Sequence, residues 1–271
     1  MNDVKFEALQ AELRRLQRVV VAFSGGADSA FLAAAATQTL GADAALAVTA
    51  VSPSLAAAEL DDCRLLSSEW GLRWQPVSTD EVERAAYRVN DAERCYHCKS
   101  ALMDVVAPIA AAEDATVVLG VNVDDLADHR PGQRAAAEAG AVFPLVTAGF
   151  TKQDVRDASR RLDLRTWDKP AAACLASRVP TGTAVTVELL STIDRAEAAV
   201  RALGFAQLRV RHHGDTARIE VDTGDLPMAI ERRDDIVAAL RPLGYRYVTL
   251  DLEGFRSGST NSVAHQYLRS P

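Results

Sequence analysis

Cys174 stands in a run of small, mostly apolar residues, KPAAACLASR (169–178), with Ser177 and Arg178 shortly after it. A cysteine in such a run is either a core residue or a reactive sulfur, because a free thiol packs like a small hydrophobe and its thiolate is a strong nucleophile. A guanidinium nearby favours the thiolate, and Arg178 lies four residues on. Taken alone the run is typical of a core, so a chemical role requires partners elsewhere in the chain.

A glycine turn, SGGADS (24–29), follows the apolar run RVVVAF (18–23) and precedes a helical pattern. Its glycines allow positive φ and let backbone N–H groups approach an anion, while the helix N-terminus adds donors and partial positive charge. Ser24 and Ser29 can donate hydrogen bonds to phosphate oxygens, whereas Asp28 suits a magnesium ion or a helix cap. A capped tight turn is the alternative, since the spacing matches neither a Walker loop nor the GxGxxG fingerprint.

The motif RCYHCK (94–99) places Cys95 and Cys98 at CxxC spacing. Such a pair is half of a zinc site, a redox pair or part of an iron–sulfur site. The chain offers no second CxxC for a closed Cys₄ zinc site, and a thioredoxin-type site is disfavoured because the pair does not open a helix after a first strand. Cys174 or His97 is left as a further ligand, and two unliganded thiols at a helix start are the alternative.

A polar segment, LGVNVDDLADHRPG (119–132), begins at the end of a predicted strand. Acidic side chains at the carboxyl end of a parallel strand lie where α/β folds bind ligands, so we expect this segment to bind magnesium or substrate. A polar loop with a helix cap is the alternative. The segment carries Asn122, Asp124, Asp125, Asp128, His129 and Arg130, of which Asn122, Asp124, Asp128 and Arg130 are the predicted site residues.

Arg209 and Arg211 alternate in the predicted strand LRVRH (208–212), so both side chains lie on one face of it. Two guanidiniums on one face predict a phosphate clamp, with a solvated strand face as the alternative. Glu188 and Glu197, in the preceding helical pattern, are candidate metal ligands that spacing alone does not separate from surface charges.

Buried strands alternate with helical patterns over the first two thirds of the chain, which indicates a parallel sheet covered by helices. The expected strands are 18–23, 44–51, 73–78 and 115–122. VPTGTAV (179–185) is the expected boundary between a domain of residues 1–178 and one of residues 179–271. In the second domain a helix, a two-stranded hairpin, another helix and a last strand predict a smaller α+β fold.

Composition limits the classes of protein that the chain can represent. It has 271 residues, 48% of them hydrophobic, and a net charge of −7, which argues against a broad nucleic-acid-binding face. No apolar run approaches the roughly 18 residues of a membrane span, and the polar amphipathic start favours a cytoplasmic protein. Four cysteines in such a chain do not indicate a disulfide framework, and Cys63, in a helical pattern, is expected to be an ordinary buried thiol.

Taken together, SGGADS, RCYHCK, GVNVDDLADHRPG, KPAAACLASRVPTG and LRVRHHGDTARIE resemble the LarE family of PP-loop ATP pyrophosphatases, in matching order from about residue 15 to 255. The resemblance implies a Rossmann-like parallel sheet with a smaller C-terminal α+β domain. It also implies an ATP-dependent sulfur transferase of nickel-pincer nucleotide biosynthesis. ATP adenylates a carboxylate of pyridinium-3,5-dicarboxylate mononucleotide with release of pyrophosphate, and a sulfur nucleophile then displaces AMP to leave a thiocarboxylate.

The resemblance assigns roles to residues of this chain and implies ATP, Mg²⁺ and a homo-oligomer. Cys174 and Asp28 are the implied catalytic residues. The implied ATP-binding residues are Ser24, Gly25, Gly26, Asp28 and Ser29. The implied phosphate-binding residues for the nucleotide substrate are Ser177, Arg178, Arg209 and Arg211, with Asn122, Asp124, Asp128 and Arg130 near substrate or magnesium.

The family has two modes of sulfur delivery. In one, the cysteine matching Cys174 gives up its own sulfur and becomes dehydroalanine; in the other, three cysteines hold a [4Fe–4S] cluster whose open iron carries a sulfide. Because Cys95 and Cys98 accompany Cys174, we expect the cluster mode. The rival functions are a tRNA thiolase, an amide-forming ligase or a non-catalytic ATP sensor; the last leaves Cys174 and the arginine pair unexplained.

Overall fold

The computed structural model describes residues 3–127, 131–170 and 173–256. Two compact units emerge, one of residues 1–87 and 91–172 and the other of residues 88–90 and 173–271. The division falls after residue 172, whereas the sequence placed it after residue 178. Asn90 shows why 88–90 join the second unit, because its side-chain amide donates to the carbonyl oxygens of Pro180 and Thr183, both at 2.9 Å.

The first unit contains the expected parallel sheet, with strand order β3-β2-β1-β4 and every pairing parallel. Its strands are β1 (Val19–Ala22), β2 (Ala45–Val51), β3 (Arg73–Ser78) and β4 (Thr116–Leu119). Val20 packs in one apolar cluster, and Val19 and Val21 pack in another, because successive strand residues point to opposite faces. Both faces of β1 are thus buried, which explains its unbroken apolar sequence.

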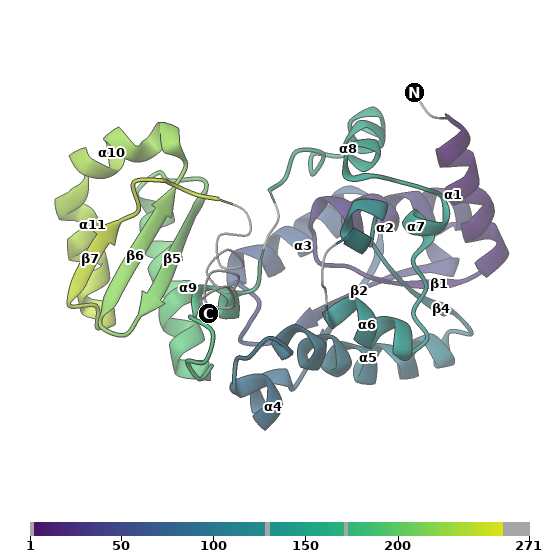
Figure 1. Ribbon diagram of the computed structural model, residues 1–271. Helices are drawn as coiled ribbons and strands as arrows, with labels where there is room; N and C mark the ends of the chain where they lie inside the picture. The colour runs from purple at the N-terminus through teal and green to yellow at the C-terminus, as the bar shows by residue number, and fades with distance from the viewer. Residues whose placement is uncertain (1–2, 128–130, 171–172, 257–271) are drawn as a thin grey trace, which may run out of the picture. The chain divides into compact units, whose positions relative to one another are not determined.

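Helices cover both faces of this sheet, as a Rossmann-like fold requires (Figure 1). One face packs against helices α1 (Asp3–Leu16), α2 (Ala27–Leu40), α3 (Ala57–Glu69) and α8 (Lys152–Arg161), and the other against α5 (Arg94–Ala112) and α6 (Pro131–Glu138). The short helices α4 (Ala85–Arg88) and α7 (Pro144–Thr147) complete the set of α-helices that the structure describes in this unit. The predicted α/β class is confirmed.

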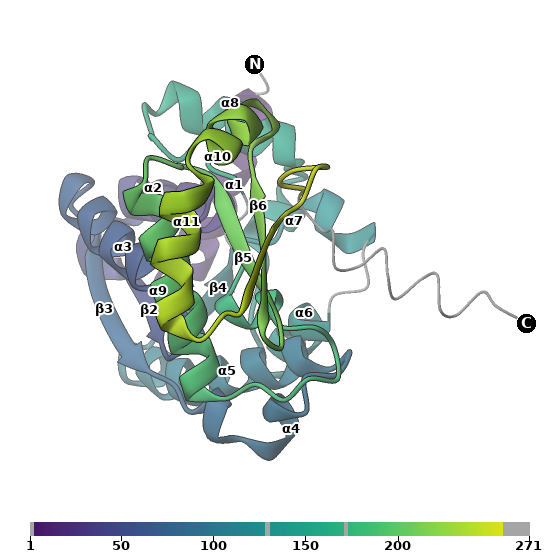
Figure 2. The same cartoon turned by 90° about the vertical axis from the view of Figure 1, so that its left-hand side faces the viewer.

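The second unit is a three-stranded sheet with helices, in agreement with the predicted α+β fold (Figure 2). Strands β5 (Leu208–His213) and β6 (Thr216–Val221) form the predicted hairpin, and β7 (Tyr247–Leu250) pairs parallel to β6. Its helices are α9 (Val187–Ala202), α10 (Leu226–Glu231) and α11 (Arg233–Leu240). Leu208 and Val210 of β5 enter the apolar core of this unit, so Arg209 and Arg211 lie on the opposite face of the strand.

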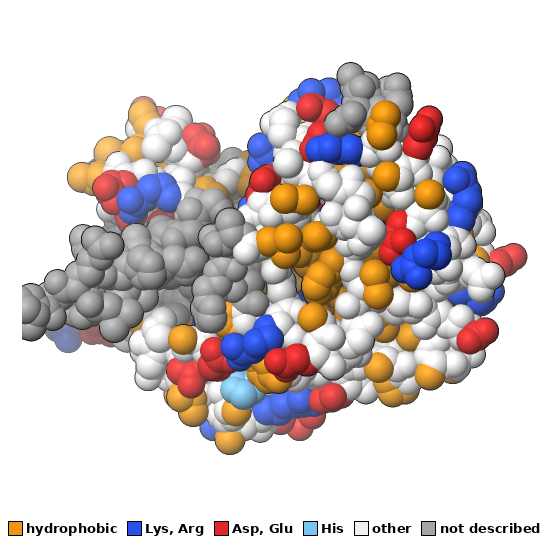
Figure 3. All heavy atoms as spheres, turned by 45° about the vertical axis from the view of Figure 1, so that its right-hand side comes forward, with side chains coloured by type: hydrophobic (Ala, Val, Ile, Leu, Met, Phe, Trp, Pro, Cys, Tyr) orange, Lys and Arg blue, Asp and Glu red, His pale blue; other side chains and the backbone are white. Residues whose placement is uncertain are grey.

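No helix among the described residues combines the length and apolar character needed to cross a membrane. On the face shown in Figure 3, acidic and basic side chains are interspersed around small apolar patches. That face therefore presents no broad basic surface within the described part of the chain, in keeping with the acidic composition.

Candidate functional site

The SGGADS loop (24–29) joins β1 to α2 in a form that only glycine supports at its first turn. Gly25 has φ +69°, and a Cβ there would lie 2.9 Å from the sulfur of Cys63. The first helical hydrogen bond runs from the Ala30 N–H to the Gly26 carbonyl oxygen at 2.9 Å, so the N–H groups of 27–29 precede it in the chain. The loop thus places backbone donors where an anion can approach the start of α2.

The two serines of the loop take different positions. Ser29 is buried; its hydroxyl donates to the Gly26 carbonyl oxygen at 3.1 Å and accepts from the Ser24 N–H at 3.2 Å. The Ser24 hydroxyl is exposed and lies 3.1 Å from the Ser29 hydroxyl. Ser29 therefore holds the loop in shape, and Ser24 offers the accessible hydroxyl.

Asp28 is oriented by the segment that follows β4. The side-chain amide of the fully buried Asn122 donates to Asp28 Oδ1 at 3.1 Å. Gly120 makes this approach possible, because a Cβ at 120 would lie 2.7 Å from the Ser29 nitrogen and 2.8 Å from the Asp28 carbonyl carbon. The sequence analysis missed Gly120, although a glycine directly after a buried strand is a signal of close backbone approach.

The acidic residues after β4 separate into capping and ion-pairing roles. Asp124 is exposed and accepts from the backbone N–H of Lys152 at 2.8 Å, which caps the start of α8. Asp125 is buried, pairs with Lys152 Nζ at 3.1 Å and bonds the backbone N–H of Asn122. The predicted residues Asp128 and Arg130 lie outside the described residues.

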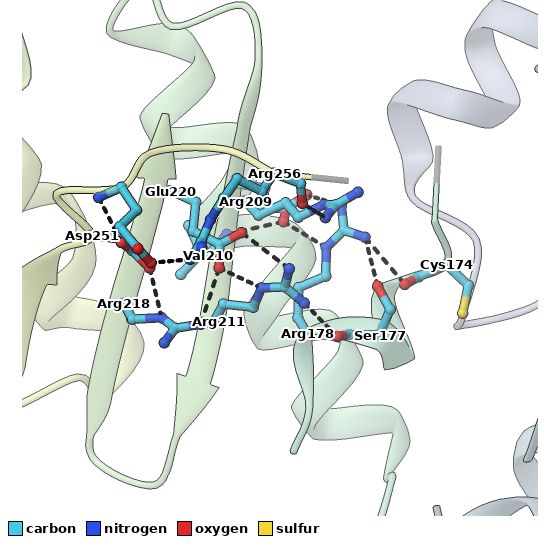
Figure 4. A network of polar contacts seen from close by, with 12 residues as sticks. Cys174, Ser177, Arg178, Arg209, Val210, Arg211, Arg218, Glu220, Asp251 and Arg256 are labelled. Atoms are coloured by element: carbon cyan, nitrogen blue, oxygen red, sulfur yellow. Dashed lines mark hydrogen bonds and ion pairs between the residues drawn. The ribbon is translucent and has the colours of Figure 1, made fainter. Parts of the chain in front are cut away.

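Arg178 forms hydrogen bonds with the backbone around Cys174, and not with the Cys174 thiol (Figure 4). Its Nη1 donates to the carbonyl oxygens of Ala173 at 2.7 Å and Cys174 at 3.2 Å, and to the Ser177 hydroxyl at 3.0 Å. Nε and Nη2 form a two-point ion pair with Glu197 at 2.8 and 3.1 Å. Figure 4 shows the Cys174 sulfur pointing away from this guanidinium, so Arg178 positions the cysteine through its main chain.

A second ion pair holds the same segment from β5. Arg211 pairs with Glu220 at 2.9 and 3.0 Å and donates to the Ser177 carbonyl oxygen at 2.8 Å. Glu197 also accepts the Val210 N–H at 3.0 Å, which ties the Arg178 pair to the strand. Arg211 is 2% exposed and Glu197 is 2% exposed, so neither the solvated-strand nor the surface-charge alternative describes them.

Arg209 is the arginine of this face with no carboxylate hydrogen-bond partner among the described residues. It is 5% exposed, donates to the Arg256 carbonyl oxygen at 3.2 Å and stacks 4.3 Å from the Phe255 ring centre. Burial, and then the charges of Arg178 and Arg211, lower its pKa to about 10. A buried guanidinium repelled by two others favours an anion beside it.

The four cysteines are free thiols in different surroundings. Cys95 is exposed and Cys98 partly exposed, one turn apart in α5, while the partly exposed Cys174 belongs to the second unit. Among the described residues no group of three or more His, Cys, Asp or Glu side chains gathers as a metal site. Cys63 is buried as predicted, and burial raises its pKa to about 11, so it stays a neutral thiol.

Comparison with known proteins decides the family. The pyridinium-3,5-bisthiocarboxylic acid mononucleotide synthase of Lactiplantibacillus plantarum is 39% identical over 260 residues, 96% of this chain and 94% of that protein. The chain belongs to the LarE family. An uncharacterized protein of Synechocystis sp. is 42% identical over 266 residues, 97% of this chain and 99% of that protein. No protein-family model matches the chain.

Because the chain belongs to the LarE family, the protein is an enzyme, a LarE sulfur transferase. Within the first unit the structure brings together Asp28, Asn122 and the loop serines. Within the second it gathers Cys174, Ser177 and the three predicted arginines. Glu197, named from the sequence only as a candidate metal ligand or surface charge, neutralises Arg178, and Glu220, which no motif indicated, neutralises Arg211. Strand register and burial set these pairs, so no local motif reveals them.

Proposed function

We propose that this LarE enzyme uses ATP to adenylate a carboxylate of pyridinium-3,5-dicarboxylate mononucleotide and then replaces the activated oxygen with sulfur. A carboxylate oxygen attacks the α-phosphorus of ATP, and pyrophosphate leaves with the electron pair of the broken P–O bond. A sulfur nucleophile then attacks the acyl carbon, AMP leaves, and a thiocarboxylate remains. The observation that carries the proposal is the glycine-dependent SGGADS loop with its donors at the start of α2.

The residues of the loop have different roles in binding ATP. Gly25 and Gly26 let the backbone approach the phosphates, the exposed Ser24 hydroxyl donates to them, and Ser29 maintains the loop. Asp28, held by Asn122, carries the carboxylate oxygens that Mg²⁺ prefers, so its chemistry fits the ion that accompanies ATP. The ion would neutralise phosphate charge when bound.

The phosphate of the mononucleotide is assigned to Arg209, with the Ser177 hydroxyl nearby in the same network. Arg178 and Arg211 already neutralise Glu197 and Glu220, so their contribution is to hold Ser177 and Cys174 in place. Arg209 brings a charge that no described carboxylate neutralises by a hydrogen bond, and guanidinium–phosphate pairs are strong two-point contacts. The predicted phosphate clamp of Arg209 and Arg211 thus becomes one phosphate-binding arginine, Arg209, which Arg178 and Arg211 support.

For sulfur delivery we propose a [4Fe–4S] cluster held by Cys95, Cys98 and Cys174. Their fit rests on donor chemistry, since the three are the partly or fully exposed thiols and Cys63 is buried. Such a cluster would supply a sulfide when bound. In the sacrificial alternative the Cys174 thiolate attacks the acyl carbon, AMP leaves, and loss of the Cα proton breaks the Cβ–S bond to give the thiocarboxylate and dehydroalanine.

One anaerobic experiment tests the function and separates these modes. Purified protein is assayed for iron and sulfide, supplied with ATP, Mg²⁺, sulfide and the dicarboxylate mononucleotide, and followed for pyrophosphate, AMP and thiocarboxylate. The cluster mode predicts bound iron, several turnovers, and loss of activity in Cys95→Ala, Cys98→Ala and Cys174→Ala alike. The sacrificial mode predicts one turnover, loss of the elements of H₂S from residue 174, and retained activity in Cys95→Ala. Full activity of Cys174→Ala contradicts both.

Two further expectations follow from the family resemblance. We propose that the enzyme is a cytoplasmic homo-oligomer that acts on a small nucleotide, without nucleic acid or membrane. Analytical ultracentrifugation measures the oligomeric state, and a sulfur-transfer assay on unmodified tRNA tests the rival thiolase function, for which we expect no product.

A further inference from the structure

Lys169 lies against the SGGADS loop of the first unit, although no motif predicted it there. A Cβ built on Gly25 would come 3.8 Å from Lys169 Nζ and 2.9 Å from the sulfur of Cys63. The side chain of Lys169 is 19% exposed. Its ammonium therefore borders the loop at the residue whose positive φ shapes the anion site.

Two carboxylates on one face of α3 hold this ammonium. Glu59 accepts from Nζ at 2.8 Å and Asp62 at 2.7 Å, which takes two of its three hydrogens. Burial by itself lowers the pKa of Lys169, but the hydrogen bonds and charges of Asp62 and Glu59 outweigh it and raise the pKa. The group beside the loop is thus a cation at neutral pH.

Lys169 is not needed merely to link its segment to α3, because Arg165 already makes that link through ion pairs with α3. Arg165 bonds Asp62 at 2.6 Å and Glu69 at 2.9 Å from the protein surface, where it is 44% exposed. Lys169 repeats that link at a site that costs more desolvation and abuts the loop. The additional feature of Lys169 is its position beside the loop, because two of its three hydrogens bond Glu59 and Asp62 and the third makes no hydrogen bond to a described residue, so it can donate to a phosphate oxygen.

We infer that Lys169 binds the pyrophosphate portion of ATP on the SGGADS loop and stabilises it as the leaving group. When the carboxylate oxygen bonds to the α-phosphorus, the bond to the bridging oxygen breaks and its electron pair passes to pyrophosphate. A preorganised ammonium at the growing charge lowers the barrier without any proton transfer. The inference rests on the proposed use of ATP at this loop and adds a residue to it.

The first test compares Lys169→Gln with the matched control Lys5→Gln in the full-length protein. Lys5 also pairs with a carboxylate, Asp154 at 2.5 Å, and its side chain is similarly covered at 26% exposed. In Lys169→Gln we expect pyrophosphate release to slow by about 100-fold and inhibition by added pyrophosphate to weaken by about tenfold. Lys169→Arg should restore part of both, and Lys5→Gln should change neither.

The second test needs no variant and works on the wild-type protein. Only the neutral fraction of an amine is acylated, so the reagent is applied at about pH 9.5, where a small fraction of each lysine is neutral, with and without magnesium pyrophosphate. The labelling rate of each lysine is measured by mass spectrometry. We expect pyrophosphate to protect Lys169 and to leave the labelling of Lys5 unchanged.

The outcomes separate this inference from the proposed function. A wild-type enzyme that releases no pyrophosphate from ATP and the dicarboxylate mononucleotide contradicts the proposed function. A wild-type enzyme that does so, while Lys169→Gln loses only thermal stability and pyrophosphate fails to protect Lys169, refutes the role of Lys169 alone. If Lys169→Gln does not fold, the labelling experiment decides.

Discussion

Replacing Glu197 by leucine leaves the Arg178 guanidinium buried without its carboxylate. In the native protein Glu197 bonds Arg178 at two points, at 2.8 and 3.1 Å, and accepts the Val210 N–H at 3.0 Å. Removing one partner of a buried ion pair typically costs about 3–5 kcal/mol, a large part of the total stability of a domain. We therefore expect Glu197→Leu to destabilise the second unit by about that amount.

The double variant Arg178→Met, Glu197→Leu distinguishes charge burial from positioning. Replacing both partners with apolar side chains is often nearly neutral, so the remaining cost is the unpaired Val210 N–H at about 1–3 kcal/mol. We expect the double variant to be about 2 kcal/mol more stable than Glu197→Leu. Sulfur transfer should still fail, because the carbonyl oxygens of Ala173 and Cys174 have lost the Arg178 donors that position them.

The assay must report on the second unit. All three tryptophans of the chain, at positions 70, 74 and 167, lie in the first unit, so their fluorescence serves as the internal control. Hydrogen exchange of peptides from α9 and β5, followed by mass spectrometry in increasing urea, measures the unfolding free energy of the second. The reasoning is refuted if the double variant is no more stable than Glu197→Leu, or if it transfers sulfur at the wild-type rate.

Three other outcomes follow from the described contacts. Gly25→Ala should abolish ATP binding measured by calorimetry, whereas Gly41→Ala, with similar φ at +84° but no atom within 4 Å of its Cβ, should cost only about 1 kcal/mol of backbone strain. Arg209→Gln should raise the KM for the mononucleotide by about 10–100-fold and leave that for its phosphate-free nucleoside unchanged, a difference that equal losses would contradict. Although burial alone raises the pKa of Asp154, hydrogen bonds from Lys5 and Thr151 bring it to about 2, so its stabilisation is present above about pH 4 and lost as pH falls toward 2. Tryptophan fluorescence should accordingly show that Lys5→Gln destabilises the first unit at neutral pH but scarcely at pH 2.

The sequence could predict features that depend on neighbouring residues. SGGADS needs a strand before it, glycines within it and a helix after it, and all three signals stand in one stretch of about twelve residues. The β5–β6 hairpin follows equally from local alternation and a glycine turn. Cys63 could be expected to be buried because it stands among the apolar positions of one helix.

The sequence could not predict which charged side chains pair with one another, because the pairing depends on which chain segments pack together. Arg178 pairs with Glu197, nineteen positions away, and also donates to the Cys174 carbonyl oxygen, and no local motif indicates the pairing with Glu197. Asp124 and Asp125 are adjacent and chemically alike, yet they contact Lys152 differently. The exposed Asp124 accepts the Lys152 backbone N–H, and the buried Asp125 pairs with the Lys152 ammonium.

By itself the sequence determined the kind of chemistry, because the anion-binding loop, the thiols and the guanidiniums are properties of residue type and local order. Only the tertiary structure decided how the charges are distributed. Burial makes an unpaired charge costly, so Arg178 and Arg211 pair with carboxylates, while Arg209 has no such hydrogen bond among the described residues. The same folding brings Lys169 to Gly25, across a separation in sequence that no motif spans.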